Sequence, residues 1–200
     1  MAKVFIICGH GDGDSGAVGN GYQEEERVRA LAKIMKEKGG ENVILGDINR
    51  NWYKEDLITK TDIPKDSKIL ELHMDAYGNP EAKGGHVIIM EGLQPDQWDK
   101  NIASLMEEIF PGRAVLINPR NLGNARRAEA KRYNYRLLEC GFITNKRDIE
   151  FFNSNIEMIA ERLLKCFDIE PAKNNKLDYE AIGKATVDFY NNTLKGLLNV

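Results

Sequence analysis

The chain has 200 residues, of which 42% are hydrophobic and 30% charged, and its formal net charge is −3 at pH 7. This length and composition predict one globular domain that is large enough to bury a core. The mild negative charge argues against a nucleic-acid partner or an anionic membrane surface, and three scattered cysteines exclude a disulfide framework. The first apolar run is too short for a signal peptide or a membrane span, so we expect synthesis in the cytoplasm without a signal peptide.

Hydrophobic runs alternate with helical patterns along the chain. The strand-like runs lie at 3–8, 42–46, 68–73, 86–90, 113–117 and 136–141, and the helical patterns lie at 23–38, 96–109, 124–132 and 146–167. This alternation predicts βαβ units, and therefore a single α/β domain with a mostly parallel, twisted sheet of about six strands flanked by helices. Gly39-Gly40 should end the first helix, and Asn145 should cap the start of the fourth.

The C-terminal part of the chain does not continue this alternation of strands and helices. We expect residues 1–168 to form the domain, 169–178 a linker and 179–200 a C-terminal amphipathic helix. The apolar residues of this last segment recur at roughly helical spacing, namely Ile182, Phe189, Leu194 and Leu197. Because an exposed apolar stripe promotes association, either the domain or a second copy of the chain should cover it. The second case would be a homodimer formed through this helix.

A glycine-rich loop, Gly9–Gly21, follows the first strand and contains the pattern Gly-x-Gly-x-x-Gly from Gly11 to Gly16. A dinucleotide-binding oxidoreductase needs a helix that opens directly on such glycines, whereas here the helical pattern begins only near Gln23. No Gly-Lys-Ser/Thr follows, which excludes a P-loop, and the twelfth position from Asp12 is not an acid, which excludes an EF-hand. The remaining interpretation is a flexible loop around a metal site, whose glycines let the backbone approach the metal ion and its substrate.

Three polar residues lie at or near the ends of predicted strands. His10 ends the first strand, His73 ends the third, and Glu139 lies within the hydrophobic run 137–143. A carboxylate in such a strand must be paired, protonated or bound to a metal, because an isolated buried charge is destabilising. The ligand crevice of an open α/β sheet lies beyond the carboxyl ends of its strands, so we expect these three residues to meet in one site.

The first helix offers an acid to the same site. Its candidates are Glu24, Glu25 and Glu26, and the helix phase places Glu24 on the buried stripe of Val28 and Leu31. Glu25 should face solvent. Taken alone, the simpler explanation is that all three acids stabilise the helix N-terminus electrostatically.

Three other polar features of the sequence each have two possible interpretations. His86 begins the fourth strand and would approach the site only if that strand ran antiparallel, so we favour an ordinary hydrogen-bonded histidine. Glu71 shares a strand face with His73 and either supports it or lies at the surface. The third feature is a basic cluster, Arg120, Arg126, Arg127 and Lys131. We favour a solvated helix face for this cluster over a binding site for an anionic group.

Together, these motifs resemble the zinc-dependent N-acetylmuramoyl-L-alanine amidases of the amidase-3 family. Glu71–Ala76 looks like that family's Ile-His-Ala-Asn-Ala segment, and Leu138–Asn145 is similar to its Val-Glu-Leu-Gly-Phe-Leu-Thr-Asn ending. The resemblance also includes Gly9-His10-Gly11, Asp14–Tyr22 and Glu24, and it covers roughly residues 3–167 in order and spacing. The chain looks most like a phage or prophage endolysin.

The resemblance implies a zinc ion held by His10, Glu24 and His73, with Glu139 as the catalytic acid and base. The implied substrate is peptidoglycan, cut at the amide bond between N-acetylmuramic acid and the L-alanine of the stem peptide, and the protein would act on the cell wall after release. The chain departs from the family at Ser15, where proline is frequent, and at Asp75, where asparagine is frequent.

Three alternative functions are weighed against this one. A zinc peptidase cutting within the stem peptide would use the same four residues. A dinucleotide-binding oxidoreductase using the glycine loop would leave His73 and Glu139 without a role. A non-catalytic wall-binding module would not require a carboxylate in the 137–143 strand.

Overall fold

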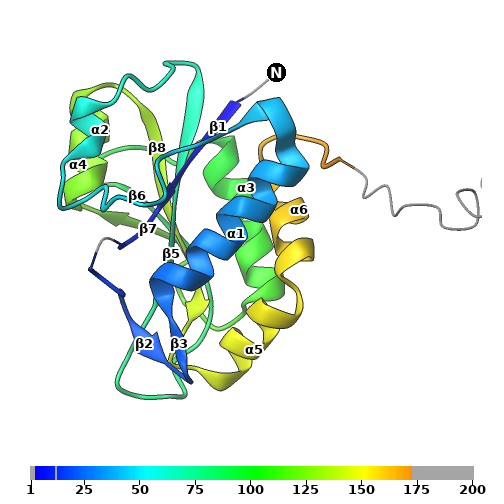
Figure 1. Cartoon of the computed structure of the whole chain (residues 1–200). Coiled ribbons are helices and arrows are strands. Elements are labelled where there is room, and N and C mark those ends of the chain that lie inside the picture. Colours follow the sequence, from blue (N-terminus) through cyan, green and yellow to red (C-terminus); the bar gives the residue numbers. More distant parts are fainter. Residues whose placement is uncertain (1–2, 12, 173–200) are drawn as a thin grey trace, which may run out of the picture.

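The computed structural model describes residues 3–11 and 13–172, which fold around one six-stranded sheet (Figure 1). Across the sheet the strands are β4 (Val43–Leu45), β1 (Lys3–Cys8), β5 (Ser67–Asp75), β8 (Asn134–Phe142), β6 (His86–Met90) and β7 (Ile117–Arg120). A small separate hairpin of β2 (Val18–Gly19) and β3 (Tyr22–Gln23) lies between β1 and the first helix.

Strand direction decides which residues share an edge of the sheet. β4, β1, β5 and β8 are parallel, while β6 runs antiparallel to β8 and parallel to β7. The predicted single α/β domain with a mostly parallel sheet is therefore confirmed. Because β6 runs opposite to β8, it begins where β5 and β8 end, and His86 pairs with Glu139 across the ladder.

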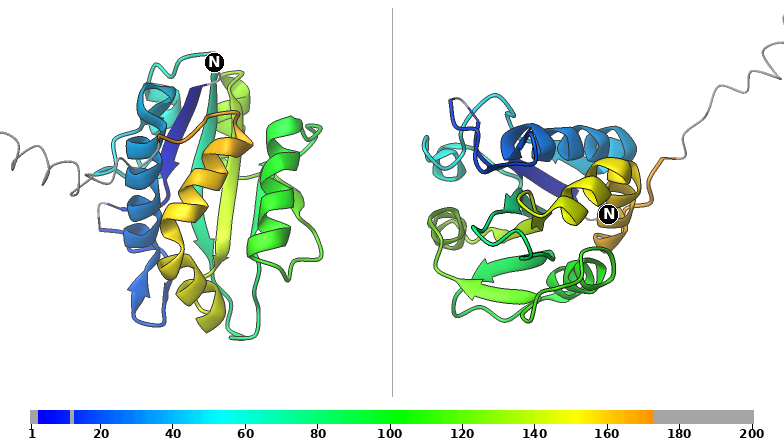
Figure 2. Two further views of the ribbon diagram at one scale, coloured as in Figure 1. Left: turned by 90° about the vertical axis from the view of Figure 1, so that its right-hand side faces the viewer. Right: turned by 90° about the horizontal axis from the view of Figure 1, so that it is seen from below.

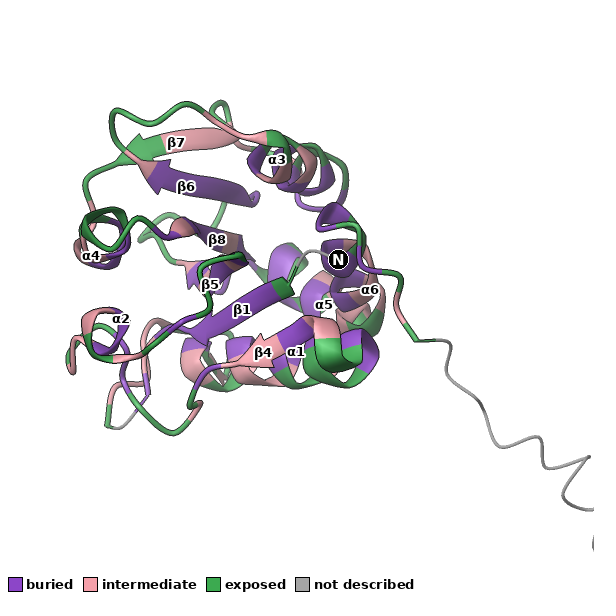
Figure 3. Cartoon of the chain, turned by 90° about the horizontal axis from the view of Figure 1, so that it is seen from above, coloured by how far each residue is buried: buried purple, intermediate pink, exposed green. Residues whose placement is uncertain are grey.

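Helices cover both faces of the sheet, as Figures 2 and 3 show. One face carries α1 (Glu24–Gly39), α3 (Gln97–Ile109), α5 (Lys146–Ser154) and α6 (Ile156–Cys166), and the other carries α2 (Leu57–Lys60) and α4 (Gly123–Ala130). A single 3-10 turn, Gly40–Asn42, links α1 to β4. Alternate residues of β1 enter different cores, with Val4 and Ile6 under α1 and with Phe5 and Ile7 on the α2–α4 side. This two-sided burial explains why the strand is a continuous hydrophobic run.

Several local expectations are confirmed. Gly39 ends α1, the side chain of Asn145 accepts a hydrogen bond from the backbone of Asp148 at the start of α5, and all three cysteines are buried and free. The sequence did not predict the short helix α2. None of the described helices is long and apolar enough to cross a membrane.

Two boundaries differ from the prediction. The strand expected at 113–117 is instead β7 at Ile117–Arg120, an edge strand where the missing N–H of Pro119 is tolerated. The helix expected at 146–167 is two helices, because the chain turns at Asn155, whose side chain donates to the carbonyl of Phe151 at 2.9 Å. Such side-chain to backbone bonds compete with helical ones.

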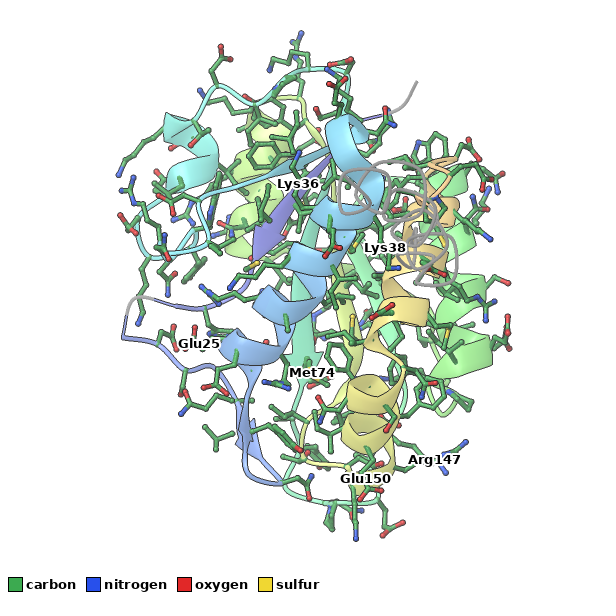
Figure 4. All side chains as sticks on the ribbon, turned by 45° about the vertical axis from the view of Figure 1, so that its right-hand side comes forward. Glu25, Lys36, Lys38, Met74, Arg147 and Glu150 are labelled. Atoms are coloured by element: carbon green, nitrogen blue, oxygen red, sulfur yellow. The ribbon has the colours of Figure 1, made fainter. Side chains whose placement is uncertain are left out.

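The first residues of the predicted linker lie along the domain. Ile169 is buried in the core, and the N–H of Ala172 donates to the carbonyl oxygen of Lys38 at 2.7 Å. Lys38 is near the end of α1, and its Nζ contacts Glu161 Oε1 of α6 at 2.8 Å (Figure 4). The rest of the linker, the expected helix at 179–200 and the homodimer expected through it lie outside the described residues.

A buried ion pair joins β8 to the start of α3, and we expect its loss to destabilise the fold. The guanidinium of Arg136 is 1% exposed, and its Nε donates to Asp99 Oδ1 at 2.7 Å. In Asp99→Ala this buried charge keeps only the partly exposed Asp96, at 3.0 Å, as an ion-pair partner, so the free energy of unfolding should fall by at most about 3–5 kcal/mol in urea denaturation. Glu108→Ala, which removes an exposed ion pair with Arg162, is the control and should have a much smaller effect. Equal effects would contradict the prediction.

Candidate metal centre

His10, Glu24 and His73 come together at one edge of the sheet from three different elements. His10 lies two residues after β1, Glu24 is the first residue of α1, and His73 is near the end of β5. One nitrogen or carboxylate oxygen from each lies within 4.8 Å of the others. Glu24 is central, because its Oε2 lies 3.2 Å from His10 Nε2 and its Oε1 lies 2.8 Å from His73 Nδ1. The group predicted from the sequence is thus assembled in the structure.

The phase of α1 selects Glu24 from its two acidic neighbours. Glu24 is buried on the same face as Val28 and Leu31, and its carboxylate accepts hydrogen bonds from two backbone N–H groups. Glu25 lies at the first turn of the helix, where it pairs with Arg29 at 3.2 Å (Figure 4). Glu26 is exposed. The prediction that Glu24 lies on the buried stripe is therefore confirmed, whereas Glu25, expected to face solvent, is half-buried against Arg29.

Glycines of the loop let these side chains approach the backbone. A Cβ on Gly9 would lie 2.3 Å from His73 Cε1, and a Cβ on Gly16 would lie 2.6 Å from His10 Cδ2. His10 itself has a φ of 60°, which is uncommon for a residue other than glycine. The glycine loop therefore surrounds the His–Glu–His group, and the β2–β3 hairpin separates it from α1, contrary to a dinucleotide-binding loop.

The three side chains shift one another's proton affinities. Burial alone would raise the pKa of Glu24, but the hydrogen bonds from His10 and His73 hold it well below its ordinary value. The hydrogen bond to Glu24 raises the pKa of His10. Burial alone would lower the pKa of His73, but Glu24 and Glu71 raise it well above its ordinary value. Proton binding and metal binding at these imidazoles therefore compete.

The donor set and its surroundings fit a catalytic zinc ion. Two imidazoles and one carboxylate are the ligand types of catalytic zinc sites with three protein ligands. In each histidine the ring nitrogen turned away from Glu24 meets a carboxylate, since His10 Nδ1 lies 3.3 Å from Asp14 and His73 Nε2 lies 3.2 Å from Glu71. Metal-binding histidines are commonly oriented in this way.

Glu71 is held by further polar groups that sequence reasoning did not identify. The Tyr135 hydroxyl donates to Glu71 Oε2 at 2.6 Å, and the Asn124 amide lies 3.0 Å from each carboxylate oxygen. Glu71 is 4% exposed. It is therefore a buried partner of His73 and not a surface acid. Tyr135 could have been noticed, because it shares a face of its strand with Glu139.

Glu139 lies directly opposite His73 in the β5–β8 ladder. Burial raises the pKa of its carboxyl group to about 7. Its Oε2 is buried without a hydrogen-bond partner among the residues described. An acid or base with a pKa near neutrality is suited to proton transfer.

Two cavities flank this edge of the sheet. The first, of about 260 Å³, is lined by His10, His73, Tyr53 and other residues on the α2–α4 side. The second, of about 570 Å³, is lined by Glu139 and His86 among others. His86 Nδ1 is buried and lacks a partner in the described part of the chain, so the hydrogen bond expected for this histidine is not formed at that nitrogen.

The basic cluster divides between two environments. Arg127 pairs with Asp56 at 2.9 Å, and Arg126 and Lys131 are exposed, as a solvated helix face should be. Arg120 instead lines the second cavity.

Comparison with known proteins identifies the family. Residues 4–166 match the family described as N-acetylmuramoyl-L-alanine amidase. The chain belongs to this family. It is 31% identical over 179 residues to a probable autolysin, PH, of Staphylococcus aureus, covering 80% of the chain and 37% of the relative. It is 29% identical over 153 residues to the N-acetylmuramoyl-L-alanine amidase LytC of Bacillus subtilis, covering 72% of the chain and 30% of the relative.

The chain thus spans about a third of the length of these curated relatives. Solved structures share its fold. An N-acetylmuramoyl-L-alanine amidase from Clostridium difficile 630 superposes with a TM-score of 0.68 at 17% identity, covering 82% of this chain and 94% of that one. The catalytic domain of the CD27L endolysin, which targets the same species, gives 0.67 at 19% identity, covering 86% and 99%. The family resemblance inferred from the motifs is confirmed.

The assignment of Glu24 can be tested by metal content. Glu24→Ala removes the only carboxylate of the three-residue group and should abolish binding of the roughly one Zn²⁺ per chain expected at a three-ligand site, as measured by calorimetric titration. Glu25→Ala, one position along the same helix, is the matched control and should bind like the wild type. If Glu25→Ala loses the ion and Glu24→Ala keeps it, the assignment is wrong.

Proposed function

We propose that the protein is a zinc-dependent peptidoglycan hydrolase that cleaves the amide between N-acetylmuramic acid and the L-alanine of the stem peptide. The observation that carries this proposal is the convergence of His10, Glu24 and His73 within 4.8 Å, in a chain of the amidase family. The names of its relatives, an autolysin and an amidase, support the same reaction. A peptidase cutting within the stem peptide would use the same residues, and the family match favours the amidase.

We assign the zinc ligands to His10, Glu24 and His73. These three residues would hold the ion and leave it accessible to water or substrate, as catalytic zinc sites with three protein ligands do. When bound, zinc polarises the scissile carbonyl and lowers the pKa of water. Asp14 and Glu71 hold the two imidazoles in the orientation that ligation requires.

We assign proton transfer to Glu139. Its carboxylate takes the proton of the attacking water as the carbon–oxygen bond forms, and gives it to the amine nitrogen as the carbon–nitrogen bond breaks. This assignment is supported by two observations: Glu139 pairs with His73 in the β5–β8 ladder, and it is not one of the three residues proposed as ligands. A dication nearby favours the ionised form, so metal binding should lower the pKa of Glu139 below the value of about 7 that burial imposes.

The cell wall is the proposed place of action, which an endolysin-type enzyme would reach after release. The presence of an endolysin catalytic domain among the structures with this fold is compatible with that role. The homodimer through the C-terminal helix remains a prediction.

The bond that is cleaved can be identified from the products. Digestion of purified cell walls should release free amino groups on L-alanine and leave the number of reducing sugar ends unchanged, because an amidase cuts no glycosidic bond. Dinitrophenylation of the new amino termini, followed by hydrolysis, measures the first quantity, and a reducing-sugar assay measures the second. New amino groups on a residue deeper in the stem would indicate the peptidase.

The role of Glu139 can be separated from metal binding. Glu139→Gln should keep the zinc content of the wild type, while kcat falls by about 10²–10⁴-fold, which is what positioned acid–base catalysis supplies. In the zinc-loaded wild type, activity should fall as the pH is lowered and Glu139 becomes protonated. Normal turnover in Glu139→Gln would rule out the proposed proton transfer, and loss of zinc would make Glu139 a ligand.

A further inference from the structure

The cavity of about 570 Å³ on the β6 side of Glu139 has no role in the mechanism so far. Its floor is part of a row of side chains across the sheet, because Glu139 pairs with His73 on one side and with His86 on the other. The same row therefore runs from a proposed metal ligand, through the proposed acid and base, to a third polar residue.

Two atoms in this cavity lack the partners that buried polar groups normally have. His86 Nδ1 and Glu139 Oε2 are both buried with no hydrogen bond to any described residue, and both side chains line the cavity. His86 is only 5% exposed. An unsatisfied buried polar atom is destabilising, so its retention points to a ligand that completes it.

The charge of the cavity indicates the kind of ligand. Arg113 is held in an ion pair with Asp75, whereas Arg120 is exposed and has no ion pair with any described residue. A free guanidinium in a cavity is suited to bind a carboxylate through two parallel hydrogen bonds. Burial and the charge of Arg113 lower the pKa of His86 to about 4, so its imidazole is neutral at pH 7 and has one donor and one acceptor nitrogen, as a peptide group requires.

The smaller cavity has a different chemistry. Its apolar and aromatic lining comes from Tyr53, Tyr135, Leu122 and Leu137, beside His10, His73 and the polar residues Asp14, Asn51, Glu71 and Asn124, and Glu139 is not among its lining residues. Aromatic and apolar surfaces of this kind suit the flat faces of a sugar ring. Glu139 therefore opens onto only one of the two cavities.

We propose that the β6-side cavity binds the leaving-group side of the substrate, as a peptide with a carboxylate close to its N-terminal residue. The inference rests on the proposed function, because Glu139 must lie within hydrogen-bond reach of the nitrogen to which it gives a proton. That nitrogen, and the peptide that follows it, then lie on the Glu139 side, and the muramoyl group lies in the smaller cavity. His86 hydrogen-bonds the peptide backbone, and Arg120 binds the carboxylate.

Kinetics on two small substrates test the role of Arg120. The substrates are N-acetylmuramoyl-L-alanyl-D-isoglutamate and its isoglutamine analogue, which differ only in a carboxylate and a carboxamide. Arg120→Ala should raise KM about tenfold for the first substrate, with kcat and the KM for the second unchanged, because only the first loses a charge-assisted hydrogen bond. Arg126→Ala, a neighbour in the basic cluster outside the cavity, is the control and should leave both KM values unchanged.

Variants of His86 test the second contact. His86→Ala should raise KM for both substrates with unchanged zinc content, and His86→Gln, which keeps hydrogen-bonding groups, should recover part of the loss. If His86→Ala fails to fold, the glutamine variant and Arg120→Ala still decide the proposal. Equal effects of Arg120→Ala on the two substrates would overturn it.

Binding of the separate products gives a readout independent of turnover. The dipeptide L-alanyl-D-isoglutamate should shift the NMR signals of the His86 ring in the zinc-loaded protein, and N-acetylmuramic acid should not. The opposite pattern would reverse the assignment of the two cavities and overturn the inference. A wild type that hydrolyses neither substrate nor cell walls would instead contradict the proposed function itself.

Discussion

The buried carboxylate of Glu24 is the interaction on which the site depends. It accepts hydrogen bonds from the backbone N–H of Ala17 in the glycine loop at 2.9 Å and from that of Met74 in β5 at 3.0 Å. Its oxygens also contact the imidazole nitrogens of His10 and His73. A buried charge requires such compensation, and its removal leaves the partners unsatisfied. One residue therefore ties helix α1, the loop and strand β5 into one arrangement, and the proposed metal ligands are positioned by the same bonds.

The antiparallel direction of β6 adds His86 to the edge of the sheet where Glu139 lies. In a wholly parallel sheet the first residue of β6 would lie at the opposite edge from His73 and Glu139. Because β6 is antiparallel to β8, His86 instead lies beside Glu139. The two sides of the proposed acid and base consequently differ, with apolar and aromatic groups on one side and a neutral imidazole and an arginine on the other. An asymmetric environment of this kind can orient an asymmetric substrate.

The errors of prediction have local physical causes. The fourth predicted helix satisfies the periodicity of one long helix, yet Asn155 interrupts it through a bond from its own side chain. The fifth predicted strand, at 113–117, is displaced because the hydrophobic residues before Ile117 do not all enter the sheet, as the 55% exposure of Val115 shows. Hydrophobicity alone cannot locate an edge strand, since only one of its sides has a neighbour.

The sequence by itself determined the parts of the protein that follow from local periodicity. Helix phase selected Glu24 over Glu25, and strand ends located His10 and His73, because a helix and a strand each repeat with a fixed geometry. Only the tertiary structure decided that Glu71 is buried with Tyr135 and Asn124, and that His86 faces the same cavity as Glu139. These contacts join residues distant in the chain, and they depend on the order and direction of strands, which no local pattern contains.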